Sequence, residues 1–148
     1  KRSVSRQPSA GSSLDSLLAA AEDSREHAYA PYSGYPVGAA VLGASGAIYG
    51  GCNVENASYG LSMCAERSAI FSAVGAGEHT IQALVVVTDR PEPAMPCGAC
   101  RQVMQEFASS PEMPIVAASS TGTQVEVSLA ELLPRPFTFH IPNSPFPS

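Results

Sequence analysis

The chain has 148 residues, of which 45% are hydrophobic and only 14% charged, and this length and composition are typical of one compact, soluble domain. No apolar run approaches the roughly 20 residues that a membrane-spanning helix needs, and the first residues lack the apolar segment of a signal peptide. The net charge is −5, and three of the eight basic residues lie within the first six positions. The rest of the chain is therefore strongly acidic, which disfavours binding to the phosphates of a nucleic acid.

Composition divides the chain into three parts. Residues 1–12 are rich in serine and lack hydrophobic periodicity, so we expect a flexible extension there. Residues 13–137 contain all of the expected helices and strands and form the one predicted folded domain. Residues 138–148 are a proline-rich tail whose role stays open.

The hydrophobic periodicity predicts alternating helices and strands along the domain. Apolar residues at helical spacing from Ser13 predict a first helix that ends before Pro31, and the continuous run Leu84–Val87 is typical of a strand buried on both faces. The other expected elements, in chain order, are a hairpin of strands over residues 35–42 and 47–52, a helix over 64–74, a strand over 81–88, a helix over 97–107, strands over 113–118 and 124–127, and a short helix over 128–132. This order predicts an α/β fold of three layers, α/β/α, in which helices cover both faces of a mixed sheet of about five strands.

Three of the four cysteines are spaced as ligands of one metal ion. Cys97 and Cys100 share one face if a helix begins there, and Cys64 begins another expected helix. The free N–H groups and partial positive charge of a helix N-terminus favour the thiolate form that binds zinc. Three thiolates leave one position for water, as a catalytic zinc site requires. This use of cysteine also indicates a reducing, cytoplasmic location rather than a disulfide framework.

Two charged residues follow Cys64 closely. Glu66 can accept a proton from a water that zinc activates and deliver it to a substrate, so we predict that it is catalytic; an isolated glutamate on a helix is more often a solvated surface residue. Three thiolates on Zn²⁺ carry an excess negative charge, which weakens the metal as a Lewis acid. Arg67 is placed to compensate by hydrogen-bonding to the sulfurs, or alternatively to pair with a surface acid.

The motifs together resemble those of the homotetrameric, zinc-dependent cytidine deaminases. The segments that carry the likeness are 31–40 (PYSGYPVGAA), 51–60 (GCNVENASYG), 64–67 (CAER) and 96–103 (PCGACRQV). The likeness covers about residues 14 to 137, nearly the whole expected domain. It implies the hydrolytic deamination of cytidine and 2′-deoxycytidine to the uridines with release of ammonia, in pyrimidine salvage, by a homotetramer with one Zn²⁺ per subunit.

The resemblance also implies roles for individual residues. Cys64, Cys97 and Cys100 match the family's zinc ligands, and Glu66 matches its proton shuttle. The matching substrate-binding positions are Asn53 and Glu55 for the ribose hydroxyls, the N–H of Ala65 for the pyrimidine carbonyl, Tyr35 beside the nucleoside, and Phe137, which in the family reaches a neighbouring subunit's site. Tyr35 departs from the family, which usually has Phe there. Asn53 can alternatively hold a turn through its side chain, and Tyr35 and Phe137 can be ordinary core residues.

Two other functions are compatible with part of this pattern. Deaminases of nucleoside-like antibiotics such as blasticidin S share Cys-x-Glu and Pro-Cys-x-x-Cys, although the intact segment Asn53–Asn56 argues against such a substrate. A fourth ligand, Cys52, would instead make a closed structural zinc site without turnover. We expect a buried free thiol at Cys52, because it ends an expected strand. We also expect a small nucleoside as the substrate and neither a nucleic acid nor a membrane as a partner.

Overall fold

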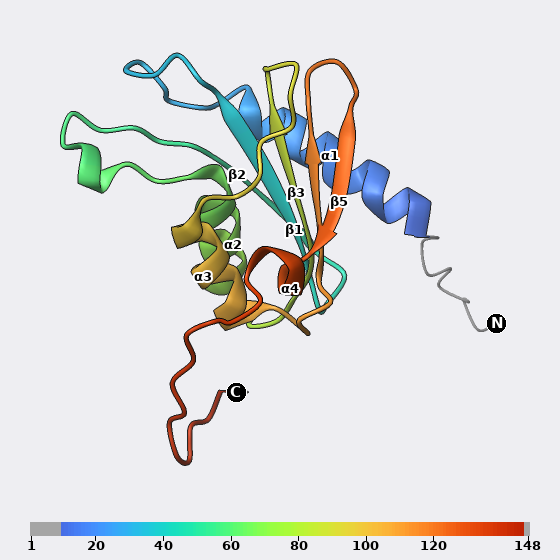
Figure 1. The fold of residues 1–148 in the computed structure, drawn as a ribbon, viewed down its shortest axis with the longest axis vertical. Coiled ribbons are helices and arrows are strands. Elements are labelled where there is room, and N and C mark those ends of the chain that lie inside the picture. Colours follow the sequence, from blue (N-terminus) through green and yellow to red (C-terminus); the bar gives the residue numbers. More distant parts are fainter. Residues whose placement is uncertain (1–9, 147–148) are drawn as a thin grey trace.

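The structure, a computed structural model, describes residues 10–146, which form a five-stranded sheet with helices on both faces (Figure 1). The expected N-terminal extension lies mostly outside the described residues, since these exclude 1–9, and residues 147–148 of the tail lie outside them as well. Residues 10–12 belong to the first helix. Within the described part of the chain, no helix has the length and apolar character needed to cross a membrane.

The order of helices and strands agrees with the sequence prediction. The elements are α1 (Ala10–Arg25), β1 (Val37–Gly43), β2 (Ile48–Cys52), the short 3-10 helix η1 (Tyr59–Leu61), α2 (Ala65–Gly75), β3 (Ile81–Thr88), α3 (Gly98–Phe107), β4 (Pro114–Ala118), β5 (Gln124–Ser128) and α4 (Leu129–Leu132). The strand order in the sheet is β2-β1-β3-β4-β5. Only β3 and β4 pair in parallel, whereas the other neighbours are antiparallel, so the sheet is mixed and the predicted fold class is confirmed.

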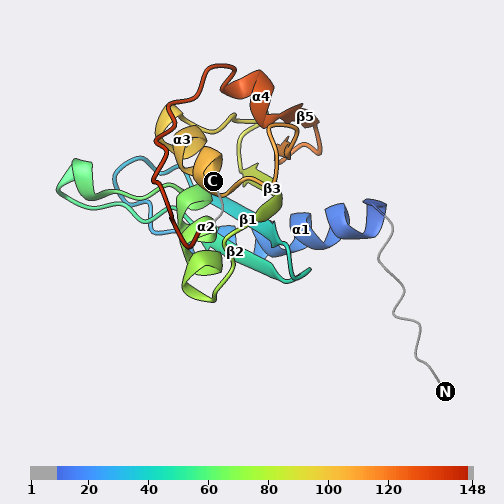
Figure 2. The same cartoon turned by 90° about the horizontal axis from the view of Figure 1, so that it is seen from below.

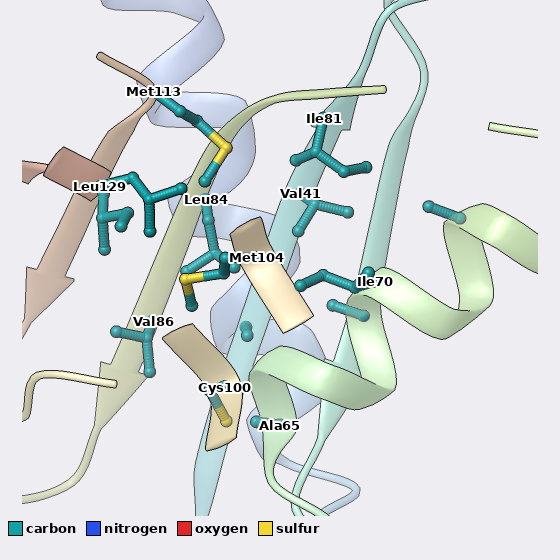
Figure 3. Packing of buried hydrophobic residues seen from close by; sticks show 14 of the residues in the cluster. Val41, Ala65, Ile70, Ile81, Leu84, Val86, Cys100, Met104, Met113 and Leu129 are labelled. Atoms are coloured by element: carbon teal, nitrogen blue, oxygen red, sulfur yellow. The ribbon is translucent and has the colours of Figure 1, made fainter. Parts of the chain in front are cut away.

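Alternating side chains of the central strands make two hydrophobic cores, one on each face of the sheet. One core packs the α1 residues Leu17 and Ala21 against Val85 and Val87 of β3. The opposite core contains Leu84 and Val86 of β3 together with residues of α2, α3 and α4 (Figure 3). Figure 2 shows the sheet between these helices. Strand β3 is therefore covered on both faces, as its continuous apolar run predicts.

The largest difference from the predicted boundaries is at α1, which begins at Ala10 rather than Ser13 and ends at Arg25, well before Pro31. The chain leaves the helix early because Tyr29 pairs with a distant segment: its N–H donates to the Asn53 carbonyl at 3.0 Å, and its carbonyl accepts from the Glu55 N–H at 2.8 Å. This pairing brings the segment after α1 beside the loop after β2.

A glycine on β2 allows α2 to lie directly against the sheet. A side chain at Gly51 would overlap the main chain of Ala69 and Ala65 in α2. The core reaches the start of this helix, since Ala65 and Cys100 are both fully buried in it and lie at the same end of the cluster (Figure 3). The packing of α2 on β2 thus fixes the position of the residues at the N-terminus of α2.

Candidate metal centre and active site

Three cysteine sulfurs converge where two helices begin. Cys64 is the N-cap residue of α2 and Cys97 that of α3, while Cys100 lies in the first turn of α3. The Sγ atoms of Cys64 and Cys97 are 3.9 Å apart, and those of Cys97 and Cys100 are 3.5 Å apart. All three lie within 4.8 Å of one another, and residues 10–146 contain no other such group of possible metal ligands.

The spacing of these sulfurs fits a zinc ion. A tetrahedral site with Zn–S bonds of about 2.3 Å places its sulfurs roughly 3.8 Å apart, close to the two separations in this cluster. Cys52 does not belong to the group; it is half-buried, where the sequence predicted a buried thiol. The donor set is therefore three thiols, the number that leaves a coordination position for water.

Arg67 lies against the cysteine cluster, as predicted. Its Nη2 donates a hydrogen bond of 3.3 Å to Cys64 Sγ. The pKa of the Cys64 thiol is lowered to about 5, first by its hydrogen bond with Cys100 and then by the hydrogen bond and positive charge of Arg67. The pKa of Cys100 moves in the opposite direction, because its interaction with the Cys64 sulfur, its burial and the nearby Glu66 carboxylate all disfavour a second thiolate. Cys64 is thus the cysteine of the cluster whose thiolate form is favoured, and Arg67 contacts it directly.

Glu66 is a buried carboxyl group beside the cluster. It is only 6% exposed, and its Oε2 accepts a hydrogen bond of 3.8 Å from Cys100 Sγ. Burial raises the pKa of Glu66 above its ordinary value, because the charged form is poorly solvated there. A carboxyl group whose pKa is moved towards neutrality is suited to take up and release a proton during a reaction.

A cavity of about 360 Å³ opens in front of the cysteines and Glu66. Its size falls within the range of small-molecule sites. Two predicted metal ligands, Cys64 and Cys97, line the cavity. The predicted catalytic and substrate-binding residues that line it are Glu66, Tyr35, Asn53, Glu55 and Ala65. The structure therefore brings together, at one cavity, residues that are spread over more than 60 positions of the sequence.

The side chains of Asn53 and Glu55 each hold part of the cavity wall. Asn53 Oδ1 accepts from the Val37 N–H at 2.9 Å, and Asn53 Nδ2 donates to the Tyr35 carbonyl at 2.9 Å. Glu55 Oε1 accepts from the N–H groups of Tyr32 and Ser33 at 3.0 and 3.1 Å. Asn53 therefore joins its own segment to residues 35–37, which lie far earlier in the chain, and these contacts are not the local turn of the alternative interpretation. An amide and a carboxylate nevertheless have more hydrogen-bonding capacity than these contacts use.

Phe137 is the one predicted substrate-binding residue that does not line the cavity. Its side chain is 72% exposed, and its main-chain carbonyl accepts a hydrogen bond of 3.0 Å from Gln102 Nε2 of α3. It is not a core residue of this chain either, so that alternative is wrong. The same alternative fails for Tyr35, which is half-buried in the cavity wall.

Sequence reasoning missed several residues of the cavity wall. Ser33, Ser62, Met63, Ala94 and Met95 line it together with Val37 and Val86. Ser33 and Val37 lie within the segment 31–40 that carries the resemblance, so their position in that motif was a usable signal. Ala94 and Met95 are apolar residues in a proline-containing loop, and only their proximity to Cys97 could have indicated a role.

Comparisons with known proteins agree with this geometry. Residues 12–116 match the family described as the cytidine and deoxycytidylate deaminase zinc-binding region. The chain is similar to a cytidine deaminase of Sporosarcina psychrophila, with 46% identity over 125 residues, 84% of this chain and 91% of that protein. It is also similar to one of Halalkalibacterium halodurans, with 45% identity over 122 residues, 82% of this chain and 92% of the relative. The crystal structure of cytidine deaminase from Burkholderia pseudomallei has a TM-score of 0.79 and 47% identity, covering 83% of this chain and 98% of that chain.

Proposed function

The chain belongs to the zinc-binding cytidine and deoxycytidylate deaminase family, and on that premise we propose that it is a hydrolase that converts cytidine and 2′-deoxycytidine to uridine and 2′-deoxyuridine with release of ammonia. The observation that carries the proposal is the position of Glu66. Its buried carboxyl group contacts one cysteine of a three-sulfur cluster and lines a cavity of about 360 Å³.

Cys64, Cys97 and Cys100 would hold one Zn²⁺ per subunit. When bound, zinc supplies Lewis acidity, which lowers the pKa of water so that it becomes a nucleophile near neutral pH. Arg67 contributes by donating to Cys64 Sγ, which offsets the excess negative charge of three thiolates. The family model and the sulfur geometry both support this assignment.

Glu66 would transfer the protons of the reaction. Water adds to the ring carbon that bears the amine, the carbon–nitrogen bond breaks, and ammonia leaves. The carboxylate accepts one proton from the water and delivers it to the ring nitrogen; it then accepts the second from the newly added hydroxyl group, as the carbonyl forms, and delivers it to the departing amine. Burial beside Cys100 raises the pKa of Glu66, so the same group can act as base and then as acid.

The other cavity residues would bind the nucleoside. Ala65 is the first residue of α2, and its N–H would donate to the pyrimidine carbonyl. Asn53 and Glu55 would use their remaining hydrogen-bonding capacity for the ribose hydroxyls, and the Tyr35 ring would lie beside the base. The presence of Asn53 and Glu55 in the cavity wall supports a ribosyl substrate over an antibiotic such as blasticidin S.

We further propose a homotetramer that acts in pyrimidine salvage in the cytoplasm, with a small nucleoside rather than a nucleic acid as its substrate. The exposure of Phe137 supports the oligomer, because this side chain lies outside the cavity of its own subunit and is available to a neighbour. Sedimentation analysis of the zinc-loaded protein tests the number of subunits. Deamination of free cytidine that is unaffected by added RNA or single-stranded DNA tests the substrate class.

The decisive experiment measures ultraviolet absorbance and ammonia release together, with zinc-loaded protein and cytidine, and with blasticidin S and adenosine in parallel. Conversion of cytidine alone is the expected result. Glu66→Gln should keep its zinc and lose about 10²- to 10⁴-fold in kcat, the usual effect of removing a general acid–base. Glu112→Gln, which changes an exposed glutamate, is the matched control. A Glu66→Gln variant with near-normal turnover would contradict the mechanism.

A further inference from the structure

An arginine outside the segments that carry the family resemblance lies over an aromatic residue of the cavity wall. The guanidinium carbon of Arg90 is 5.1 Å from the centroid of the Tyr35 ring. This distance is within the range of a cation–π interaction. Tyr35 lines the cavity, whereas Arg90 does not, so Arg90 reaches the cavity only through the tyrosine.

The main chain around Arg90 is held by the turn between β4 and β5. The Ser120 N–H donates to the Arg90 carbonyl at 3.1 Å, and Thr121 Oγ1 donates to the Pro91 carbonyl at 3.2 Å. In Figure 1 the loop that follows β3 runs beside this turn. The anchored loop therefore presents the Arg90 side chain to Tyr35 from a fixed position.

The main chain of Tyr35 is also fixed, from the other side. Asn53 Nδ2 donates to its carbonyl at 2.9 Å, and its N–H donates to Ser33 Oγ at 3.1 Å. These contacts leave the side-chain torsions of Tyr35 undetermined. The guanidinium of Arg90 lies over the face of this half-buried ring, where it can favour one orientation of the ring.

We propose that Arg90 is a positioning residue for the nucleoside: its guanidinium holds the Tyr35 ring in the orientation that receives the substrate. This proposal rests on the proposed function. Without Arg90 the ring regains freedom that binding must remove again, so affinity falls. The bond-breaking step should be unaffected, because the hydrogen bonds of Glu66 and of the three cysteines given above do not involve Arg90.

The competing interpretation treats Arg90 as an ordinary surface residue. Its Nε lies 3.6 Å from Asp89 Oδ1, and the side chains of Arg90 and Asp89 are 51% and 40% exposed, so this ion pair is weak. If that pair were the whole role of Arg90, substrate affinity would not depend on it. The two interpretations therefore differ in a measurable way.

The test is a double-mutant cycle between Arg90 and Tyr35, measured with the zinc-loaded enzyme. The variants are Arg90→Met, Arg90→Lys, Tyr35→Leu, Tyr35→Phe and the combinations of Arg90→Met with each tyrosine change. The readouts are kcat and KM for cytidine and, by calorimetry, the dissociation constant of the product uridine. Arg25→Met is the matched control, since Arg25 lies on α1, across the sheet from α2 and α3.

Arg90→Met is expected to raise KM and the uridine dissociation constant about two- to fivefold, the effect of an exposed cation–π contact, with kcat unchanged. Arg90→Lys should recover most of the affinity because it restores a cation. The effect of Arg90→Met should persist beside Tyr35→Phe, which keeps the ring, and vanish beside Tyr35→Leu.

Unchanged affinity in Arg90→Met would overturn the proposal, as would the same loss in both tyrosine backgrounds. A loss confined to kcat would overturn it as well. Failure of the unaltered enzyme to deaminate cytidine would instead overturn the proposed function, and with it the role of Arg90.

Discussion

The Arg67 guanidinium donates a hydrogen bond of 3.3 Å to the sulfur of Cys64, three residues earlier in the chain. Cys64 caps the helix to which Arg67 belongs, so the guanidinium and the free N–H groups of the first turn act at the same end of the helix. The pKa of Cys64 is lowered to about 5, first by Cys100 and then by Arg67. The start of α2 thus favours a thiolate beside the buried carboxyl group of Glu66.

Replacing Arg67 with Gln should lower kcat about 10- to 100-fold while zinc stays bound, because a hydrogen bond to a charged group contributes roughly 1.5–3 kcal/mol. Arg67→Lys should be intermediate, since it keeps the charge but not the planar geometry of the donors. The measurement is kcat normalised to zinc content determined by mass spectrometry. Normal turnover by a fully loaded Arg67→Gln enzyme would rule out charge compensation by this residue.

Serine variants of Cys52 and Cys97 distinguish a catalytic zinc site with three cysteine ligands from a closed structural site with four. Because Cys52 is not in the sulfur cluster, Cys52→Ser should keep one zinc per chain and normal activity. Cys97→Ser removes a ligand and should lose both. Zinc content and thermal unfolding of the two serine variants, measured side by side, provide the comparison. Loss of zinc from Cys52→Ser would support the structural alternative.

Gly51→Ala should disturb the metal centre indirectly, by displacing α2 from strand β2. The added methyl group would overlap the main chain of Ala69 and Ala65, which forces the helix away from β2 and costs about 1–3 kcal/mol, as overpacking usually does. Because α2 carries Cys64 at its start, zinc affinity should fall together with stability. The measurements are urea unfolding and competition with a chelator.

Gly75→Ala is the control for Gly51→Ala. Gly75 ends α2, and an added methyl group there meets no atom within 4 Å. Its free energy of unfolding should be unchanged or slightly higher, since alanine reduces the freedom of the unfolded chain. Equal stability of the two alanine variants would show that the contact between α2 and β2 is less constrained than the structure indicates.

Glu55 should make one contribution to the acid sensitivity of the protein. Hydrogen bonds from the Ser33 hydroxyl, from the Ser33 N–H and from the Tyr32 N–H hold the pKa of Glu55 below its ordinary value of 4.5. A carboxyl group with a lowered pKa stabilises the folded state above its ordinary pKa, and this contribution is lost as the pH falls through the lowered value.

The Tm difference between the unaltered protein and Glu55→Gln should therefore be constant from about pH 7 to about pH 5 and shrink as the pH falls below 4.5. Glutamine remains neutral throughout and cannot show this dependence. Glu112→Gln, which changes an exposed glutamate, controls for the loss of a charge. A Tm difference that grows on acidification would have the wrong sign for a lowered pKa.

The type and order of the expected helices and strands, and the members of the sulfur cluster, could be predicted from the sequence. These features depend on local information. Periodicity distinguishes a strand such as β3, with its run of apolar residues, from a helix, and the spacing of Cys97 and Cys100 already places both sulfurs on one turn. The position of Glu66 beside the cluster could be expected as well, because Glu66 lies two residues from Cys64 at the start of α2.

The neighbours of these residues from distant parts of the chain could not be predicted in this way. The bonds of Asn53 to Val37 and Tyr35, the placement of Arg90 over Tyr35, and the exposure of Phe137 join or separate residues far apart in the chain. No local pattern encodes such contacts, because they depend on strand order, on the packing of α2 against Gly51 and on the course of loops between elements. Short sequence motifs therefore predict the chemically reactive groups of this site, whereas the shape of the cavity depends on the packing of the whole chain.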